Sequence, residues 1–335
     1  MWRNYIAFFN NNATPGLRNI GKYGPPVKVN SRKKIFDSRW EIWNNFPQPD
    51  AVRWRESFCK GETEMTYRPE DVWEDLERIR TRRPLVHNIT NYVVMNSTAN
   101  ALLAIGASPV MAHADQEVED MVGIAAALVI NIGTLSEQWT KSMFMAARRA
   151  GQLGIPIVLD PVGAGATPYR TRTARQLLEA IAPAVIRANA SETIAMVAAD
   201  KRTKGVDSTA ASSEALTAAR TLNAEFGSVV CVSGAEDYIV GGGRLFIVGN
   251  GHALMARVTG LGCTASALCG AFAAVRREDI IRATASAMAV MGIAGEIAAA
   301  RADGPGSMQV IFLDALYGLT RRDIEERLKL TVQEL

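Results

Sequence analysis

Apolar and polar positions alternate along the chain in blocks that predict strands and helices in turn. Residues 126–132 (AALVINI) form an almost unbroken apolar run, as expected of a strand buried on both faces. Ser136 can cap a helix that runs to Ala150, and Gly151 and Gly154 can end it. Similar short apolar runs predict further strands at residues 108–112, 155–159, 184–187 and 229–232.

Helical periodicity separates these strands. Residues 237–240 and 244–248 flank three glycines and predict a β-hairpin. Repeated β-α units of this kind predict a mostly parallel sheet with helices on both faces, built as one domain. The expected helices are 73–82, 96–105, 171–181, 191–199, 210–226, 263–275, 279–300 and 308–317.

The first 64 residues differ in composition from the rest. Residues 1–36 carry seven Lys or Arg and no Asp or Glu, and prolines interrupt any helical period. This composition suits a transit peptide. Because Met65 is followed by a sensible helix start, we interpret 1–64 as an extension outside the catalytic fold, and 65–335 as the domain. The extension is interpreted as a disordered arm or an over-extended reading frame, with a targeting segment as the alternative.

Composition bounds the function. Apolar residues make up 48% of the 335, so a large core can form, and a net charge of +3 gives no reason to expect nucleic acid. Residues 283–295 are apolar but too short for a membrane span, and predict a buried core helix. The cysteines lack metal-site spacing, which favours reduced thiols in a cytoplasmic protein; they are Cys59, Cys231, Cys263 and Cys269.

The strongest candidate for chemistry is the turn Val258-Thr259-Gly260-Leu261-Gly262-Cys263, directly before a predicted helix. Two glycines there allow backbone N–H groups to face an anion, and the helix dipole adds to the attraction. Phosphoryl transfer needs such a cradle. A plain turn with a helix cap explains the pattern about as well when it is taken alone. The helix start is also expected to lower the pKa of Cys263.

Polar residues end the other buried strands, where ligands bind in sheets of this kind. Asp160 is one of them, and Ser233 is another. Asn189 and Glu192 could hold hydrated magnesium, or form a helix capping box instead. Arg187, just upstream, could bind a phosphate. The glycine pattern excludes a Rossmann dinucleotide site and a P-loop.

Several blocks together resemble the hydroxyethylthiazole kinases, a branch of the ribokinase-like kinases. PLVHNITN at 84–91 and GASPVMAHA at 106–114 are two of them, and the similarity runs in order over about residues 70–330. The resemblance implies a three-layer α/β/α sandwich with a central, mostly parallel sheet. The other blocks are residues 96–100, 131–135, 160–167, 187–192, 250–263 and 304–307.

The resemblance also implies an activity: phosphorylation of the primary alcohol of 4-methyl-5-(2-hydroxyethyl)thiazole by ATP and Mg²⁺, for thiamine synthesis. Cys263 stands where most ribokinase-like enzymes carry an aspartate base, with Gly260 and Gly262 beside it. Homotrimers are typical of the family. The low net charge and the lack of a long apolar run indicate neither a nucleic-acid nor a membrane partner. The implied ligand contacts are Met111, Asn91 and Gly260 for the alcohol, Arg187, Ser233 and Asn189 for ATP, and Asp160 and Glu192 for magnesium.

Two residues depart from the family pattern. Ser233 replaces the usual threonine and keeps the hydroxyl. Leu261 stands where alanine or threonine is usual, and its bulk is expected to narrow the pocket and lower catalytic efficiency. Two alternatives stay open: another ribokinase-like alcohol kinase, such as one acting on hydroxymethylpyrimidine, or a binding protein without catalysis on the same fold.

Overall fold

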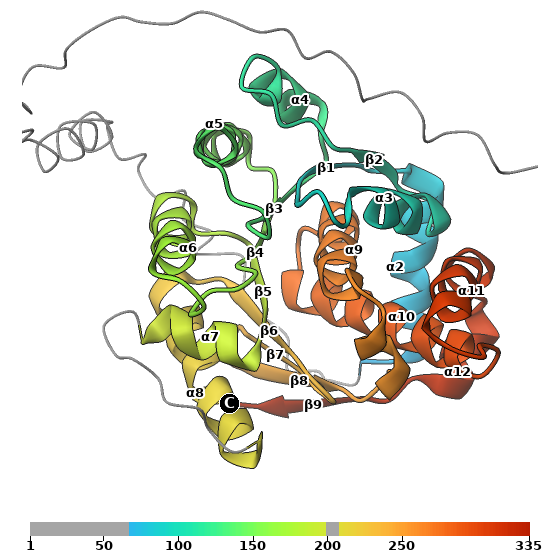
Figure 1. Ribbon diagram of the computed structural model, residues 1–335. Coiled ribbons are helices and arrows are strands. Elements are labelled where there is room, and N and C mark those ends of the chain that lie inside the picture. The colour runs from blue at the N-terminus through green and yellow to red at the C-terminus, as the bar shows by residue number, and fades with distance from the viewer. Residues whose placement is uncertain (1–66, 199–207) are drawn as a thin grey trace, which may run out of the picture. The chain divides into compact units, whose positions relative to one another are not determined.

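The structure is a computed structural model that describes residues 67–198 and 208–335 (Figure 1). The predicted extension, residues 1–64, lies outside the described residues, and its boundary stays a prediction. In the described part of the chain, nine strands form one sheet in the order β2-β1-β3-β4-β5-β6-β7-β8-β9. The strands are β1 (Leu85–Ile89), β2 (Ser108–Val110), β3 (Ala127–Asn131), β4 (Ile157–Asp160), β5 (Val185–Asn189), β6 (Val229–Ser233), β7 (Asp237–Gly241), β8 (Arg244–Val248) and β9 (Leu330–Glu334).

The sheet is parallel from β2 through β6 and antiparallel from β6 to β9. From β1 the chain moves to β2 on one side and then returns to β3 on the other. In open sheets, ligands bind where the strand order reverses in this way, at the carboxyl ends of the strands. The gap between the ends of β1 and β3 is therefore the place where a site is expected.

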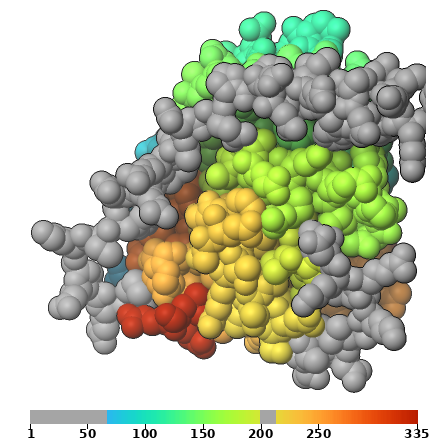
Figure 2. Space-filling view, turned by 90° about the vertical axis from the view of Figure 1, so that its left-hand side faces the viewer, coloured from blue at the N-terminus to red at the C-terminus, as the bar shows by residue number. Residues whose placement is uncertain are grey.

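Helices cover both faces of this sheet, so the predicted three-layer α/β/α sandwich is confirmed (Figure 1). One apolar cluster lies between the sheet and α4 (Val118–Ile124), α5 (Glu137–Leu153), α6 (Pro168–Ile181), α7 (Ala190–Val197) and α8 (Ser208–Phe226). In the space-filling view α6 and α7 (yellow-green) and α8 (yellow) cover this face (Figure 2). The other cluster lies beneath α2 (Pro69–Arg82), α3 (Met95–Ala104), α9 (Leu261–Val275), α10 (Ile280–Ala299), α11 (Pro305–Gly318) and α12 (Arg321–Arg327).

Two apolar helices fill the second cluster. In α9 nearly every side chain after Cys263 is buried, which fits a helix enclosed on all sides. Of the helices that the structure describes, only α10 has the length and apolar composition to cross a membrane, but 83% of that stretch is buried inside the domain. The prediction of a buried core helix at residues 283–295 is confirmed.

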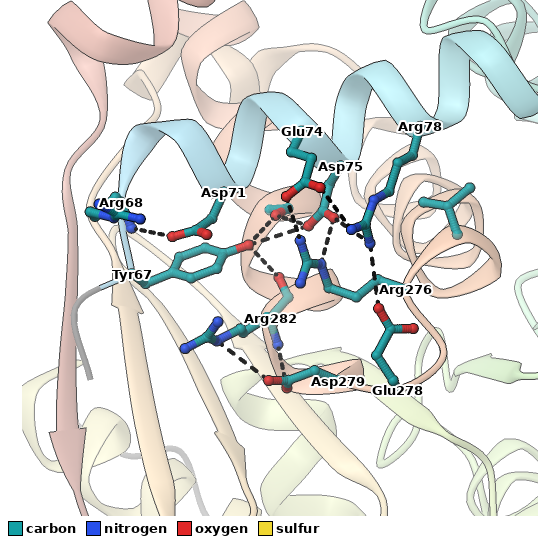
Figure 3. Close-up of polar contacts among 12 residues, drawn as sticks. Tyr67, Arg68, Asp71, Glu74, Asp75, Arg78, Arg276, Glu278, Asp279 and Arg282 are labelled. Atoms are coloured by element: carbon teal, nitrogen blue, oxygen red, sulfur yellow. Dashed lines mark hydrogen bonds and ion pairs between the residues drawn. The ribbon is translucent and has the colours of Figure 1, made fainter. Parts of the chain in front are cut away.

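A buried polar network joins α2 to α10 and to the end of α9 (Figure 3). Asp75, fully buried on α2, accepts hydrogen bonds from Arg276 Nε at 2.5 Å and from Ser286 Oγ at 2.8 Å. The Tyr67 hydroxyl contacts Ser286 and donates to the carbonyl oxygen of Arg282 at 3.2 Å. Both oxygens of Asp75 are thus hydrogen-bonded, as a buried carboxylate requires.

The elements predicted from the apolar pattern are confirmed in type, and most of their ends differ by one to three residues. The pattern did not predict β1, α4, α12, β9 or the 3₁₀ turn Ala253–Arg257. Strand β1 carries His87 and Asn88, two polar side chains that break its apolar run. Both are buried. His87 Nε2 is hydrogen-bonded to the carbonyl of Ala112 at 2.8 Å, a contact with a distant segment, and Asn88 Nδ2 donates to the nearby carbonyl of Val86 at 2.9 Å.

Candidate active site

Asp160 ends β4, an interior strand of the sheet, and is the centre of a buried polar cluster. Its Oδ2 accepts hydrogen bonds from Asn131 Nδ2 and from Ser266 Oγ, both at 2.7 Å. Asn131 ends the neighbouring strand β3 and in turn accepts a hydrogen bond from Asn91 Nδ2, at 2.9 Å. Asn91 follows β1, so this chain of bonds crosses the gap at which the strand order reverses.

The other carboxylate oxygen, Asp160 Oδ1, is buried and has no hydrogen-bond partner among the described residues. Such an atom is costly unless a ligand completes its contacts. Burial raises the pKa of Asp160 to about 6, while the charge of Arg187 and the hydrogen bond from Ser266 act in the opposite direction. A cation bound beside Asp160 would therefore stabilise its ionised form.

Arg187, in β5, faces this cluster from the next strand. Its Nη2 donates to Ser233 Oγ at 2.6 Å, whereas its Nε is buried and unpaired in the described part of the chain. Burial opposes its charge, but the carboxylates of Asp160 and Asp237 outweigh burial and raise the pKa of Arg187. A permanently charged guanidinium with an unused donor is suited to an anion.

Asn189 and Glu192 form the capping box of α7, so that alternative from the sequence is confirmed. Asn189 Oδ1 accepts the Glu192 N–H at 2.9 Å, and Glu192 Oε2 accepts the Asn189 N–H at 3.0 Å. The other oxygen of Glu192 accepts the N–H of Gly163, at 2.8 Å. The cap fixes the Glu192 carboxylate beside Asp160, close enough for its charge to raise the pKa of Asp160.

The glycine turn leads into α9 as the sequence predicts, but the helix begins at Leu261. Gly260 is its N-cap residue with a φ of 85°, a left-handed conformation that favours glycine, and a side chain there would meet Val94. At Gly262 a Cβ atom would lie 3.0 Å from Arg187 Nη1. The first N–H groups of a helix have no intrahelical partner, so those of α9 open beside the guanidinium of Arg187.

Cys263, in the first turn of α9, accepts a hydrogen bond from Asn91 Nδ2 at 3.4 Å. The prediction that the helix start lowers the pKa of this thiol is wrong. Burial raises the pKa of Cys263, and the neighbouring carboxylate of Asp160 raises it further, while the hydrogen bonds from Asn131 and Asn91 act in the opposite direction. A thiolate beside a buried carboxylate would place two negative charges together, so the thiol is favoured.

Met111 lies further along the edge of the sheet, after β2. Its carbonyl accepts a hydrogen bond from His113 Nδ1 at 3.2 Å, and the ring of His113 packs on Trp139 with centroids 4.5 Å apart. Tyr92, next to Asn91, packs on the same indole at 4.7 Å. The loops that carry Met111 and Asn91 are therefore joined through Trp139.

Leu261 lines a pocket of about 50 Å³ between α3, α9 and α11, together with Asn96 and Phe312. The Leu261 side chain takes up space in this pocket. The residue of the turn that faces Arg187 is Gly262, not Leu261. The expectation that Leu261 lowers catalytic efficiency stays a prediction.

Asn131 and Ser266 are site residues that sequence reasoning did not single out. Asn131 is a polar residue in an otherwise apolar strand, which is a usable signal. Ser266 follows Gly262 by four residues, one helical turn, and so lies on the same face of α9. Only the packing of α9 on β4 shows that its hydroxyl reaches Asp160.

The donor atoms fit magnesium better than a softer metal. The candidates are carboxylate oxygens, which magnesium prefers, and one of them is the unpaired Asp160 Oδ1. No group of three or more His, Cys, Asp or Glu side chains that could hold a metal occurs in the described residues. Two carboxylates suffice for magnesium, because the ion usually keeps waters and takes further ligands from a phosphate.

Comparison with known proteins shows the family of this chain. A sequence model of the hydroxyethylthiazole kinase family matches residues 76–322. The hydroxyethylthiazole kinase of Syntrophus aciditrophicus is 61% identical over 271 residues, 81% of this chain and 100% of the relative. That of Leptospira biflexa is 58% identical over 255 residues, 76% of this chain and 95% of the relative.

Solved structures agree in fold. A hydroxyethylthiazole kinase protein from Pyrococcus horikoshii matches with a TM-score of 0.73 and 47% identity, over 79% of this chain and 100% of that one. A ribokinase-like protein from Enterococcus faecalis has a TM-score of 0.51 at 14% identity, over 76% of this chain and 90% of that one. The second likeness shows the ribokinase-like fold alone. With the matches in sequence, it follows that this chain belongs to the hydroxyethylthiazole kinase family.

Proposed function

We propose that the protein transfers the γ-phosphoryl group of ATP to the primary alcohol of 4-methyl-5-(2-hydroxyethyl)thiazole, with Mg²⁺, at the cluster around Asp160. The observation that carries the proposal is the unpaired, buried Asp160 Oδ1 beside Arg187 and the open start of α9. A carboxylate, a guanidinium and free helix N–H groups are the three parts that a phosphoryl group in transfer requires.

The nucleotide end is formed by β5, β6 and the start of α7. Arg187 would bind phosphate oxygens through Nε and its remaining donors, while Ser233 holds Nη2 and fixes the plane of the guanidinium. Asn189 is exposed at the cap of α7, where its amide could contact the nucleotide. Asp160 and Glu192 would hold magnesium, which when bound neutralises the charge of the phosphates.

The acceptor end lies toward β1 and β2. Asn91 and Met111 would contact the thiazole alcohol, next to Gly260 at the start of α9. Cys263 would orient the reacting hydroxyl, because its protonated thiol and the Asn91 amide lie together. The N–H groups of the Gly260–Cys263 turn would stabilise the charge on the transferred group. A loose transition state needs little help from a base, so catalysis rests on positioning.

The decisive experiment measures ADP release with the thiazole alcohol and with hydroxymethylpyrimidine, each with and without Mg²⁺. Turnover is expected with the thiazole alcohol and Mg²⁺, and is expected to disappear when EDTA removes the metal. Preference for hydroxymethylpyrimidine would instead favour the alternative kinase. No turnover on either, with a thermal shift on addition of the thiazole alcohol, would favour a binding protein.

Cys263→Ser tests the role of the thiol. Because the raised pKa keeps the thiol protonated near neutral pH, the serine variant should keep its rate within about tenfold and show the same pH profile. The measurement is kcat against pH for both proteins. Loss of an alkaline rise in rate in the serine variant would show that a thiolate acts as base.

Asp160→Asn tests the energetic consequence of burial. The folded pKa of about 6 lies above the unfolded value, so this group favours folding at low pH, and that advantage is lost as pH rises from about 4 to about 6. Without metal or nucleotide, the neutral asparagine should make the protein about 3 kcal/mol more stable than wild type above pH 6 and leave stability nearly equal near pH 4.

Urea unfolding at several pH values measures this difference. The matched control is Asp120→Asn, an exposed acid on α4 that should change stability little at any pH. A free energy of unfolding for Asp160→Asn that parallels wild type across the whole pH range would contradict the prediction.

The protein is further proposed to act as a homotrimer in the cytoplasm. In support, α3 and α11 pack together and expose large apolar side chains: Leu103 is 58% exposed, Val310 63% and Tyr317 77%. Exposed apolar surface of this kind is typical of subunit interfaces. Light scattering should give three times the subunit mass for wild type and a lower mass for Val310→Glu with Tyr317→Glu. A wild-type monomer would contradict the trimer.

A further inference from the structure

Arg170 lies in the first turn of α6 and directs its side chain to the loops that follow β3 and β4. Its Nη1 donates to the carbonyl oxygens of Ile132 and Val162, and its Nη2 donates to that of Gly133, each at 2.8 Å. In the described part of the chain its guanidinium forms no ion pair with a carboxylate. The guanidinium therefore donates to backbone carbonyls, and its planar, spread donors fit their positions better than the single nitrogen of an ammonium would.

The first peptide group that Arg170 holds joins Ile132 to Gly133. The carbonyl of this group accepts from Arg170, and its N–H donates to Asn131 Oδ1 at 2.9 Å. A peptide group is planar, so fixing the carbonyl also fixes the direction of the N–H. Asn131 is in this way turned so that its Nδ2 donates to Asp160, at 2.7 Å.

The second peptide group joins Val162 to Gly163. Its carbonyl accepts from Arg170, and its N–H donates to Glu192 Oε1 at 2.8 Å. Gly163 has a φ of 76°, and a Cβ atom there would lie 3.1 Å from Arg170 Cδ, so glycine allows the close approach of the guanidinium. Each of the two peptides thus receives a cation at its oxygen. The N–H of the second orients the Glu192 carboxylate directly, whereas the N–H of the first acts on Asp160 through the Asn131 amide.

A positive charge at a carbonyl oxygen also polarises the peptide and strengthens the hydrogen bond that its N–H makes. The helix start supports this arrangement, because Thr167 Oγ1 caps α6 by accepting the Arg170 N–H, at 3.3 Å, and Thr171 Oγ1 accepts the N–H of Gly165, at 2.8 Å. The loop from Asp160 to Thr167 is therefore bound to α6 through the backbone N–H and the side chain of Arg170 and through the hydroxyl of Thr171.

We propose that Arg170 is a positioning residue that sets the orientation of Asp160 and Glu192 toward a metal-bound nucleotide through these two peptide groups. The inference rests on the proposed role of the two carboxylates in holding magnesium. Arg170 touches neither carboxylate, and it acts only through the backbone of residues 132–133 and 162–163 and through Asn131.

Arg170→Gln tests the effect on the metal site. Support of a ligand by its neighbours is typically worth 10- to 100-fold in metal affinity, so the variant should bind Mn²⁺ in the presence of ADP about tenfold more weakly. Electron paramagnetic resonance of free Mn²⁺ measures this affinity without turnover. The KM for the thiazole alcohol should change less than about twofold, because the acceptor end lies toward β1 and β2.

Two further variants separate positioning from general damage. Arg170→Lys keeps the charge but lacks the planar donors, so its Mn²⁺ affinity should lie between those of wild type and Arg170→Gln. Arg172→Gln removes an exposed charge two residues along α6 and should leave Mn²⁺ affinity unchanged. Unchanged Mn²⁺ affinity in Arg170→Gln would overturn the proposal. So would a rise in the KM for the acceptor as large as the fall in Mn²⁺ affinity, together with a lower Tm.

Amide hydrogen exchange in the protein without metal or nucleotide keeps this test independent of the proposed function. The N–H groups of Gly133 and Gly163 should exchange faster in Arg170→Gln than in wild type, and unchanged exchange at both would overturn the inference. If wild type binds no Mn²⁺ with ADP, the proposed function fails, and the exchange measurement still decides whether Arg170 orients the two peptides.

Discussion

The candidate site depends on one constraint: a carboxylate must be kept ionisable at the buried end of β4, an interior strand of the sheet. Asp160 is 1% exposed, and the chain compensates for the lost water with an amide, a hydroxyl and a guanidinium from three other elements. Those elements are β3, α9 and β5, so their relative placement is tied to one side chain. The compensation is incomplete, because one oxygen of Asp160 has no partner in the described residues and the pKa is raised to about 6. Incomplete compensation leaves a bond for a ligand to make.

A second buried aspartate, Asp75, differs from Asp160 in that both of its oxygens accept hydrogen bonds. Asp75 has donors on both oxygens, from Arg276 and Ser286, and joins α2, α9 and α10 without an opening for a ligand. The two networks lie at opposite ends of α9, since Arg276 follows its last residue and Cys263 belongs to its first turn. The same residue type therefore serves as an anchor where its bonds are complete, and offers a candidate ligand site where they are not.

The thiol of Cys263 shows how tertiary surroundings outweigh a local rule. A helix start lowers the pKa of a cysteine when solvent and positive charges surround it. Here burial and the neighbouring Asp160 carboxylate act in the opposite direction and prevail. A protonated thiol beside a buried carboxylate limits the negative charge of the cluster. In the proposed reaction this thiol would orient the reacting hydroxyl.

The sequence by itself determined the order of strands and helices, the glycine turn before α9 and the residues at the ends of β4 and β5, because apolar periodicity and turn residues act over a few positions. It could not determine β9, which forms only by pairing with β8, or β1, whose buried His87 needs the carbonyl of Ala112. Nor could it reveal that Asn131 and Ser266 donate to Asp160, that Arg170 donates to the carbonyl of Gly133, or the direction of the Cys263 pKa. These depend on which groups meet across the sheet, and burial and hydrogen bonding between distant segments exist only once the layers have packed.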